Sequence, residues 1–154
     1  MENLFNRLEV LLQKTSMDWT IFWRELSWYP TQLLDDNTHT IVSACYDKNK
    51  YVLHVSEWHT WIADWRYLLE KEGWSSEDIS DHMFNINPKY ILREWMLSKA
   101  YTDAEGGEYS TIKDLYKLFL DPYDRTDTNG DKWYGLTPQE LINKPGIGSM
   151  TCSS

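Results

Sequence analysis

Apolar residues recur at helical spacing along most of the chain, beginning near the N-terminus. Over residues 2–14 they lie three or four positions apart and predict one helix face, made of Leu4, Phe5, Leu8, Leu11 and Leu12. Asp18 can cap a second, short helix over residues 19–27, because its carboxylate can accept a hydrogen bond from the first turn. We expect this helix to bury Phe22, Trp23 and Leu26.

The next segment, residues 37–55, has no clear period. Two apolar groups flank the polar run Asp47-Lys48-Asn49-Lys50, which is compatible with a hairpin or with two helical pieces. The sequence leaves both alternatives open, with a short hairpin around residues 40–55 as one of them.

The strongest helical pattern follows from Ser56 to Gly73. Its apolar residues gather on one side of a helical wheel, with His59, Arg66 and Glu70 on the other; they are Trp58, Trp61, Ile62, Trp65, Leu68 and Leu69. We expect Trp58, Trp61 and Trp65 to form one face that is either core or a docking surface.

Two signals for the start of a helix follow in the sequence. Residues 75–78 resemble a capping box, and Asn87-Pro88 combines a favourable cap residue with a proline that suits the first helical position. The sequence therefore predicts a helix over residues 88–104 that is apolar on two faces. Arg93 would lie between those faces, where a guanidinium needs oxygen partners, so a structural clamp is the favoured role.

The remaining sequence predicts one more helix and a tail. Gly106-Gly107 ends the preceding helix, Ser110 or Thr111 can cap the next, and Asp121-Pro122 stops it. Residues 123–154 are rich in turn formers and predict an extended tail ending in Cys-Ser-Ser. The expected fold is thus mainly α, an irregular helical bundle over residues 1–122 followed by this tail.

Composition narrows the classes of function. A length of 154 residues suits one core, and a formal net charge of −9 argues against nucleic acid and anionic membrane as partners. No apolar stretch is long enough to span a membrane, and no targeting signal is recognisable. Nine Trp and ten Tyr indicate a large aromatic core or interface.

Candidate catalytic and metal motifs fail on spacing. Residues 124–131 begin like a calcium loop, but Gly130 in sixth place would put Arg125 first and Leu136 twelfth. The four histidines match no zinc pattern, and no glycine-rich phosphate loop or nucleophile elbow occurs. We therefore predict no catalytic, metal-binding or cofactor-binding residue in this chain.

Four separate pieces of the sequence nevertheless resemble one family in their order and spacing. They are residues 14–27 (KTSMDWTIFWRELS), 87–95 (NPKYILREW), 121–124 (DPYD) and 151–154 (TCSS). Together they are similar to the C-terminal part of selenoprotein O (SelO), a family of pseudokinase-like protein adenylyltransferases. The resemblance covers nearly all of this chain but only the last quarter to third of a typical member.

The resemblance implies a larger kinase-like protein that transfers AMP from ATP, with Mg²⁺, to Ser, Thr or Tyr hydroxyls of protein substrates. The kinase-like catalytic domain is expected upstream and absent here, so this chain alone would be inactive and that domain its partner. The compartment expected for the family is the mitochondrion in eukaryotes and the cytoplasm in bacteria. Cys152 resembles the family's redox-active Cys or selenocysteine near the C-terminus.

A protein of another class is the alternative: a stand-alone helical interaction module that docks a partner through its tryptophan-rich face.

Cys45 lies among apolar residues and is expected to be buried, whereas Gly and Ser surround Cys152. A free Cys152 thiol is the favoured state in this chain.

Overall fold

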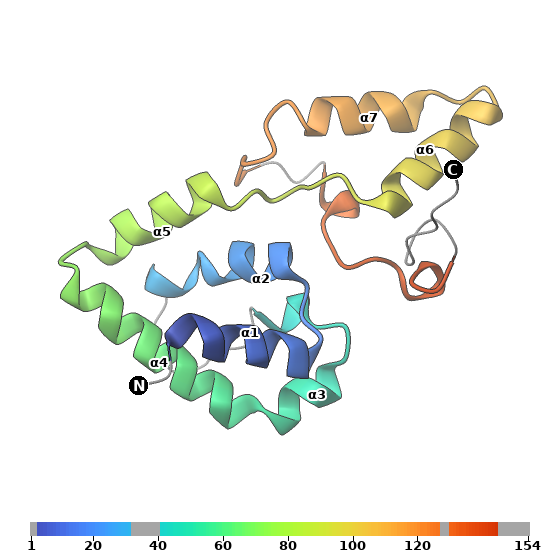
Figure 1. The fold of residues 1–154 in the computed structure, drawn as a ribbon. Helices are drawn as coiled ribbons and strands as arrows, with labels where there is room; N and C mark the ends of the chain where they lie inside the picture. The colour runs from blue at the N-terminus through green and yellow to red at the C-terminus, as the bar shows by residue number, and fades with distance from the viewer. Residues whose placement is uncertain (1–2, 32–40, 127–129, 145–154) are drawn as a thin grey trace. The chain divides into compact units, whose positions relative to one another are not determined.

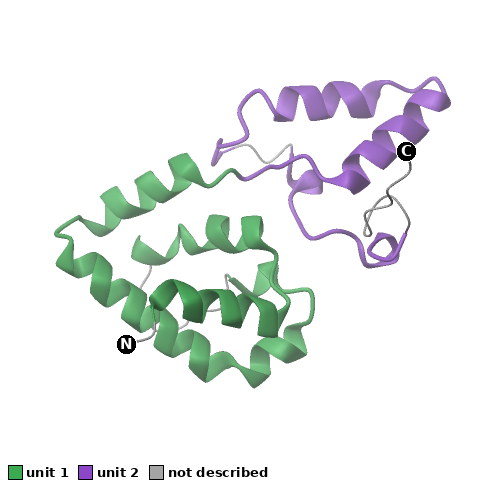
Figure 2. Ribbon diagram, in the orientation of Figure 1, with its two compact units in different colours: residues 1–88 green, residues 89–154 purple. Residues whose placement is uncertain are grey.

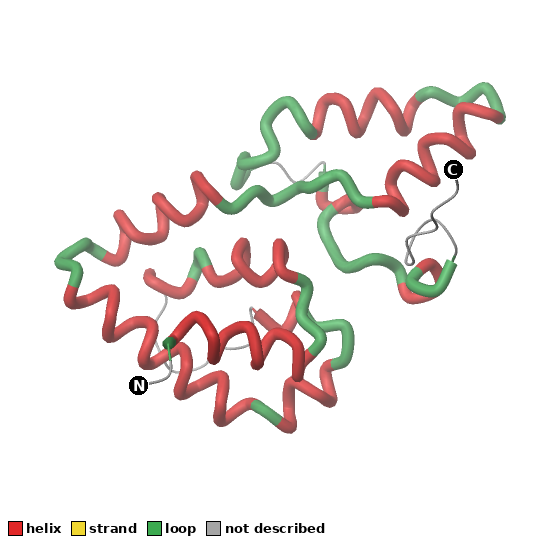
Figure 3. Tube along the Cα trace, in the orientation of Figure 1, coloured by secondary structure: helices red, strands yellow, loops and turns green. Residues whose placement is uncertain are grey.

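The computed structural model describes residues 3–31, 41–126 and 130–144, and within these ranges the mainly helical fold is confirmed (Figure 1 and Figure 3). The chain forms two compact units, unit 1 over Met1–Pro88 and unit 2 over Lys89–Ser154 (Figure 2). The boundary predicted from the sequence lies instead after residue 122. The units divide earlier because Trp133, from the expected tail, packs into the core of unit 2.

Unit 1 begins with the two helices that the apolar pattern predicts. Helix α1 spans Leu4–Thr15 and buries its leucine face, and helix α2 spans Trp19–Leu26. Asp18 caps α2 as expected, since its Oδ1 accepts a hydrogen bond from the Ile21 amide at 3.0 Å. The expected burial holds for Phe22 and Leu26, whereas Trp23 is only half-buried.

The ambiguous segment is helical over its described part, residues 41–55, and the hairpin alternative is wrong there. It forms a 3-10 turn, η3 (Ile41–Ala44), and helix α3 (Lys48–Leu53). Asp47 decides the outcome locally, because its Oδ1 accepts from the Asn49 amide at 3.0 Å and caps α3. Residues 37–40 lie outside the described residues.

The tryptophan-rich helix is confirmed as α4, Val55–Lys71. It packs beside α1 (Figure 1), and the Trp61 Nε1 donates a hydrogen bond to the Leu4 carbonyl at 2.9 Å. Leu68, expected on the buried face, is half-exposed instead. Arg66, expected on the opposite face, donates to the Tyr29 carbonyl at 2.5 Å in the short turn η1 (Tyr29–Thr31).

Helix α5, Ser76–Ile86, begins at the predicted cap, where the Ser75 Oγ accepts from the Asp78 amide at 3.1 Å. The helix predicted from Pro88 is wrong in its start, because residues 88–93 are not helical and α6 spans only Glu94–Glu105. The amides of Lys89 and Tyr90 donate to the Pro122 carbonyl at 2.8 and 3.3 Å. These contacts hold the segment out of a helix, so Asn87 ends α5 rather than starting α6.

Unit 2 has its own apolar core between α6 and α7, which spans Ser110–Leu118. The predicted side-chain cap of α7 is wrong: Tyr109 is the N-cap residue and makes no side-chain cap bond. The Thr111 hydroxyl donates instead to the Asp103 carboxylate of α6. The core contains Tyr90, Met96, Ala100, Leu115, Leu118 and Trp133.

The described part of the predicted tail folds against this core. It contains the short turns η4 (Asp131–Trp133) and η5 (Gln139–Leu141), and the Trp133 ring stacks on Trp95 with centroids 5.6 Å apart. Gly130 passes so close to the core that an added Cβ would lie 2.7 Å from the Tyr90 hydroxyl. Residues 145–154, the predicted Cys-Ser-Ser end, lie outside the described residues.

Candidate functional site

The three tryptophans predicted to share a face do so inside unit 1. Trp58 and Trp61 are fully buried and Trp65 is 8% exposed, and successive rings along α4 lie 6.1 Å apart between centroids. The ring centroid of Phe22, in α2, lies 5.5 Å from that of Trp58 and 6.2 Å from that of Trp61. Helices α2 and α4 thus meet through a continuous aromatic layer, which makes this face part of the core.

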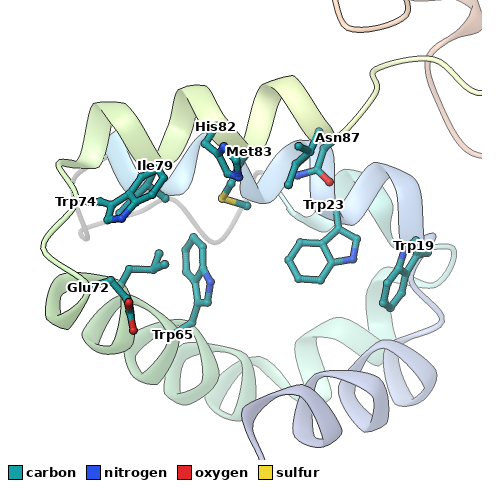
Figure 4. Close-up of a pocket in the computed structure, with 11 residues that line it drawn as sticks. Trp19, Trp23, Trp65, Glu72, Trp74, Ile79, His82, Met83 and Asn87 are labelled. Atoms are coloured by element: carbon teal, nitrogen blue, oxygen red, sulfur yellow. The ribbon is translucent and has the colours of Figure 1, made fainter.

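Beyond Trp65 the aromatic layer opens into a groove bounded by α2, α4 and α5 (Figure 4). Its volume is about 610 Å³, within the usual range for binding pockets. We call it the tryptophan groove and define it by its lining residues, which are Trp19, Trp23, Trp65, Leu69, Glu72, Trp74, Ile79, His82, Met83, Ile86 and Asn87.

The floor and the ends of the tryptophan groove differ in exposure. Trp65 and Met83 are each only 8% exposed and form buried parts of the lining. Trp19 and Trp74 are 50% and 53% exposed, and Figure 4 shows them at opposite ends of the groove. The groove therefore combines a fixed apolar floor with large aromatic rings that are still accessible to another surface.

Polar groups are sparse in this lining. Asn87 is already engaged, because its Nδ2 donates to the Ser27 Oγ at 3.3 Å. The His82 ring contacts the edge of Trp74, with centroids 5.6 Å apart, and Glu72 lies near the Trp74 end (Figure 4). Such a lining suits an apolar ligand or surface better than a polar ligand that hydrogen bonds must orient.

A buried arginine fixes the wall that α5 contributes. Arg24 of α2 is 3% exposed, and its Nη1 donates to the carbonyls of Phe84 at 3.3 Å and Asn87 at 2.8 Å. The Phe84 carbonyl needs such a donor, because the residue four positions later is Pro88, which has no N–H. The guanidinium also lies 4.7 Å from the centre of the Phe84 ring, which adds a cation–π contact.

The other residues singled out from the sequence are dispersed. Asn87 lines the groove as the C-cap of α5, and Pro88 follows it. Arg93 lies in unit 2 as the half-buried N-cap residue of α6, so the expected position between two helix faces is wrong. Cys152, the redox candidate, lies outside the described residues.

Sequence reasoning missed the residues that shape the groove. Trp19, Trp23 and Trp74 come from two separate segments, and no local period links them. Arg24 could have been noticed, because it follows Trp23 in a short helix whose residues are mostly apolar. A charged residue in such a setting indicates a buried partner.

Among the described residues, no three His, Cys, Asp or Glu side chains lie close enough together to hold a metal ion. None of the described helices is both long and apolar enough to cross a membrane. Cys45 is buried and donates from its Sγ to the carbonyls of Thr15 and Asp47 at 2.9 and 3.0 Å. Burial raises the pKa of the Cys45 thiol, which lowers its reactivity.

The fold and the groove define a helical region that carries an open aromatic groove. Comparison with known families identifies this region: the family model described as "Protein adenylyltransferase SelO" matches residues 1–120. The chain belongs to the SelO family.

Individual relatives agree with this assignment. The "Protein nucleotidyltransferase YdiU" of Flavobacterium johnsoniae is 32% identical over 154 residues, which cover 99% of this chain and 29% of that protein. The protein of the same name from Tolumonas auensis is 28% identical over 98% of this chain and 28% of its own length. This chain therefore spans less than a third of the length of these relatives.

Proposed function

We propose that this chain is the C-terminal helical region of a SelO-type protein adenylyltransferase. The observation that carries the proposal is the family match over residues 1–120, together with relatives named nucleotidyltransferases that are more than three times as long as this chain. In the whole protein, a Ser, Thr or Tyr hydroxyl of a protein substrate would attack the α-phosphate of ATP, form an AMP ester and release pyrophosphate, with Mg²⁺ as the metal. The bacterial relatives favour the cytoplasm over the mitochondrion as its compartment.

On this proposal the residues that bind ATP and Mg²⁺ belong to the kinase-like part of the protein, which is the partner of this chain. The 154 residues contain none of the common phosphate-binding loop motifs. We therefore expect the isolated chain to be inactive, with a role in supporting the fold of the kinase-like part.

Calorimetric titration of the isolated chain with ATP and MgCl₂ tests whether this chain lacks the nucleotide-binding site. We expect no heat of binding, and no label on an acceptor protein after incubation with ATP labelled at its α-phosphate. The Flavobacterium johnsoniae relative, treated in parallel, is the positive control for AMP transfer. Micromolar binding of ATP by the isolated chain, or labelled acceptor protein, would contradict the proposal.

A second candidate function is a stand-alone helical interaction module. The observation that favours it is the half-exposed Trp19 and Trp74 in the groove, since exposed aromatic surface marks interaction sites. The DNA upstream of Met1 separates the two candidates. An in-frame coding sequence for a kinase-like domain supports the adenylyltransferase region, and a promoter at that position supports the module.

A further inference from the structure

The tryptophan groove is a concave surface of unit 1 with a mainly apolar lining. Two of its rings, Trp19 and Trp74, are half-exposed at its ends, and Ile86 of α5 is exposed beside it. Exposed apolar residues elsewhere on unit 1, such as Leu53 of α3, do not line this groove. Contiguous apolar surface of this kind is typical of a region that another protein surface covers.

The polar groups of the groove argue against a small polar ligand as its occupant. A small-molecule site usually has several polar groups that converge to orient the ligand. Here the Asn87 amide donates to Ser27, and the His82 ring lies against Trp74. What remains for the occupant is mainly indole surface, which is suited to apolar side chains.

The comparison with relatives indicates where such side chains can come from. The match to the Flavobacterium johnsoniae protein uses 99% of this chain but only 29% of that protein. In that relative, the matched region is therefore covalently joined to more than twice its own length of polypeptide. A covalently joined surface is present at high effective concentration, so an open apolar groove on one part is readily covered by the other.

We propose that the tryptophan groove is the surface through which unit 1 docks onto the remainder of the longer polypeptide, and that its occupant is an apolar segment of that remainder. This inference rests on the proposed function, because it requires the chain to be one part of a SelO-type protein. It goes further by assigning the contact to one groove, with Trp19 and Trp74 as the rings that become buried.

Hydroxyl-radical labelling read by mass spectrometry tests this assignment at single residues. The 154 residues would replace the matched segment of the Flavobacterium johnsoniae relative, and labelling of this hybrid would be compared with labelling of the isolated chain. We expect the labelling rates of Trp74 and Trp19 to fall severalfold in the hybrid. Trp61, which is 1% exposed, is the internal control and should label slowly in both proteins.

A pair of variants tests whether the groove contributes to docking. Trp74→Ala removes a half-exposed ring outside any helix, so it should change the melting temperature of the isolated chain little but lower that of the hybrid. Leu53→Ala is the matched control, because Leu53 is 78% exposed and lies away from the groove lining. If Trp74→Ala and Leu53→Ala lower the melting temperature of the hybrid equally, the assignment to the groove is wrong.

The outcomes separate this inference from the proposed function. AMP transfer by the hybrid together with unchanged Trp74 labelling overturns the docking surface and leaves the proposed function standing. Protected Trp74 without AMP transfer supports the docking surface and contradicts the activity. If the hybrid does not fold, the isolated chain is mixed with the separately produced remainder of the relative, and unchanged Trp74 labelling in that mixture also overturns the inference.

Discussion

Replacement of Arg24 by Met should destabilise unit 1 far more than loss of an ordinary surface charge. Arg24 is 3% exposed and donates to two carbonyls at the C-terminal end of α5, those of Phe84 and Asn87. Methionine keeps much of the apolar stem but offers no donor. The variant therefore leaves the Phe84 carbonyl, whose usual helical donor is missing at Pro88, without this hydrogen bond.

The size of the effect follows from the geometry of these contacts. A hydrogen bond from a charged donor contributes about 1.5–3 kcal/mol to stability. The longer bond, to Phe84, is buried, whereas the shorter one, to Asn87, is partly accessible and can be replaced by water in part. Adding the cation–π contact with the Phe84 ring, worth about 1 kcal/mol, we expect a total loss of about 3 kcal/mol.

Urea unfolding followed by tryptophan fluorescence measures this loss, because most of the tryptophans lie in unit 1. Arg7→Met is the matched control: Arg7 pairs with Asp64 at 2.6 Å, but its side chain is 30% and that of Asp64 48% exposed, so we expect a cost of at most about 1 kcal/mol. Arg24→Lys should retain part of the stability. If Arg24→Met costs no more than Arg7→Met, the hydrogen bonds from Arg24 to Phe84 and Asn87 do not stabilise unit 1.

Three further predictions concern the two cores and the cysteines. Trp61→Ala should lower the free energy of unfolding by about 3–5 kcal/mol, measured by urea unfolding, because it empties a buried site. Gly130→Ala should cost about 1–3 kcal/mol by thermal unfolding, because its methyl group would overlap the side chains of Leu118 and Tyr90; an unchanged melting temperature would contradict this packing. Alkylation with peptide mapping should label Cys152 before Cys45, since burial raises the pKa of Cys45 and keeps its thiol protonated; equal rates would show that Cys45 is accessible.

Helices whose signals are local could be predicted from the sequence. Asp18 and Ser75 cap α2 and α5 by accepting hydrogen bonds from amides three residues ahead. Donor and acceptor therefore lie within four consecutive residues of the sequence. Gly73 likewise follows α4 with φ of 76°, a conformation that glycine adopts without steric cost. The apolar period of α4 correctly indicated the burial of Trp58, Trp61, Ile62 and Trp65, because a helix packed on one side needs only one apolar stripe, but it wrongly included Leu68.

Asn87-Pro88 shows where local information is insufficient. The same dipeptide suits the start of a helix and the end of the one before it, because proline fits the first turn but cannot continue a preceding helix. The choice is made by the Pro122 carbonyl, which accepts hydrogen bonds from Lys89 and Tyr90 and lies far along the chain. A contact between residues so far apart in the sequence cannot be recognised from the residues around Pro88 alone.

The tryptophan groove could not be predicted because it depends on how three helices meet. Composition indicated an aromatic core or interface, and the structure contains both buried and accessible rings: Trp58 and Trp61 are buried, while Trp19 and Trp74 are half-exposed. Helix α5 borders the groove because it is held to α2, which carries two of the groove tryptophans, by the Arg24 hydrogen bonds and by bonds from Ser80 and Asn87 to Ser27. Arg24 donates two of these hydrogen bonds, so it contributes to the shape of the proposed docking surface. A change at Arg24 should therefore weaken docking even though its side chain does not line the groove.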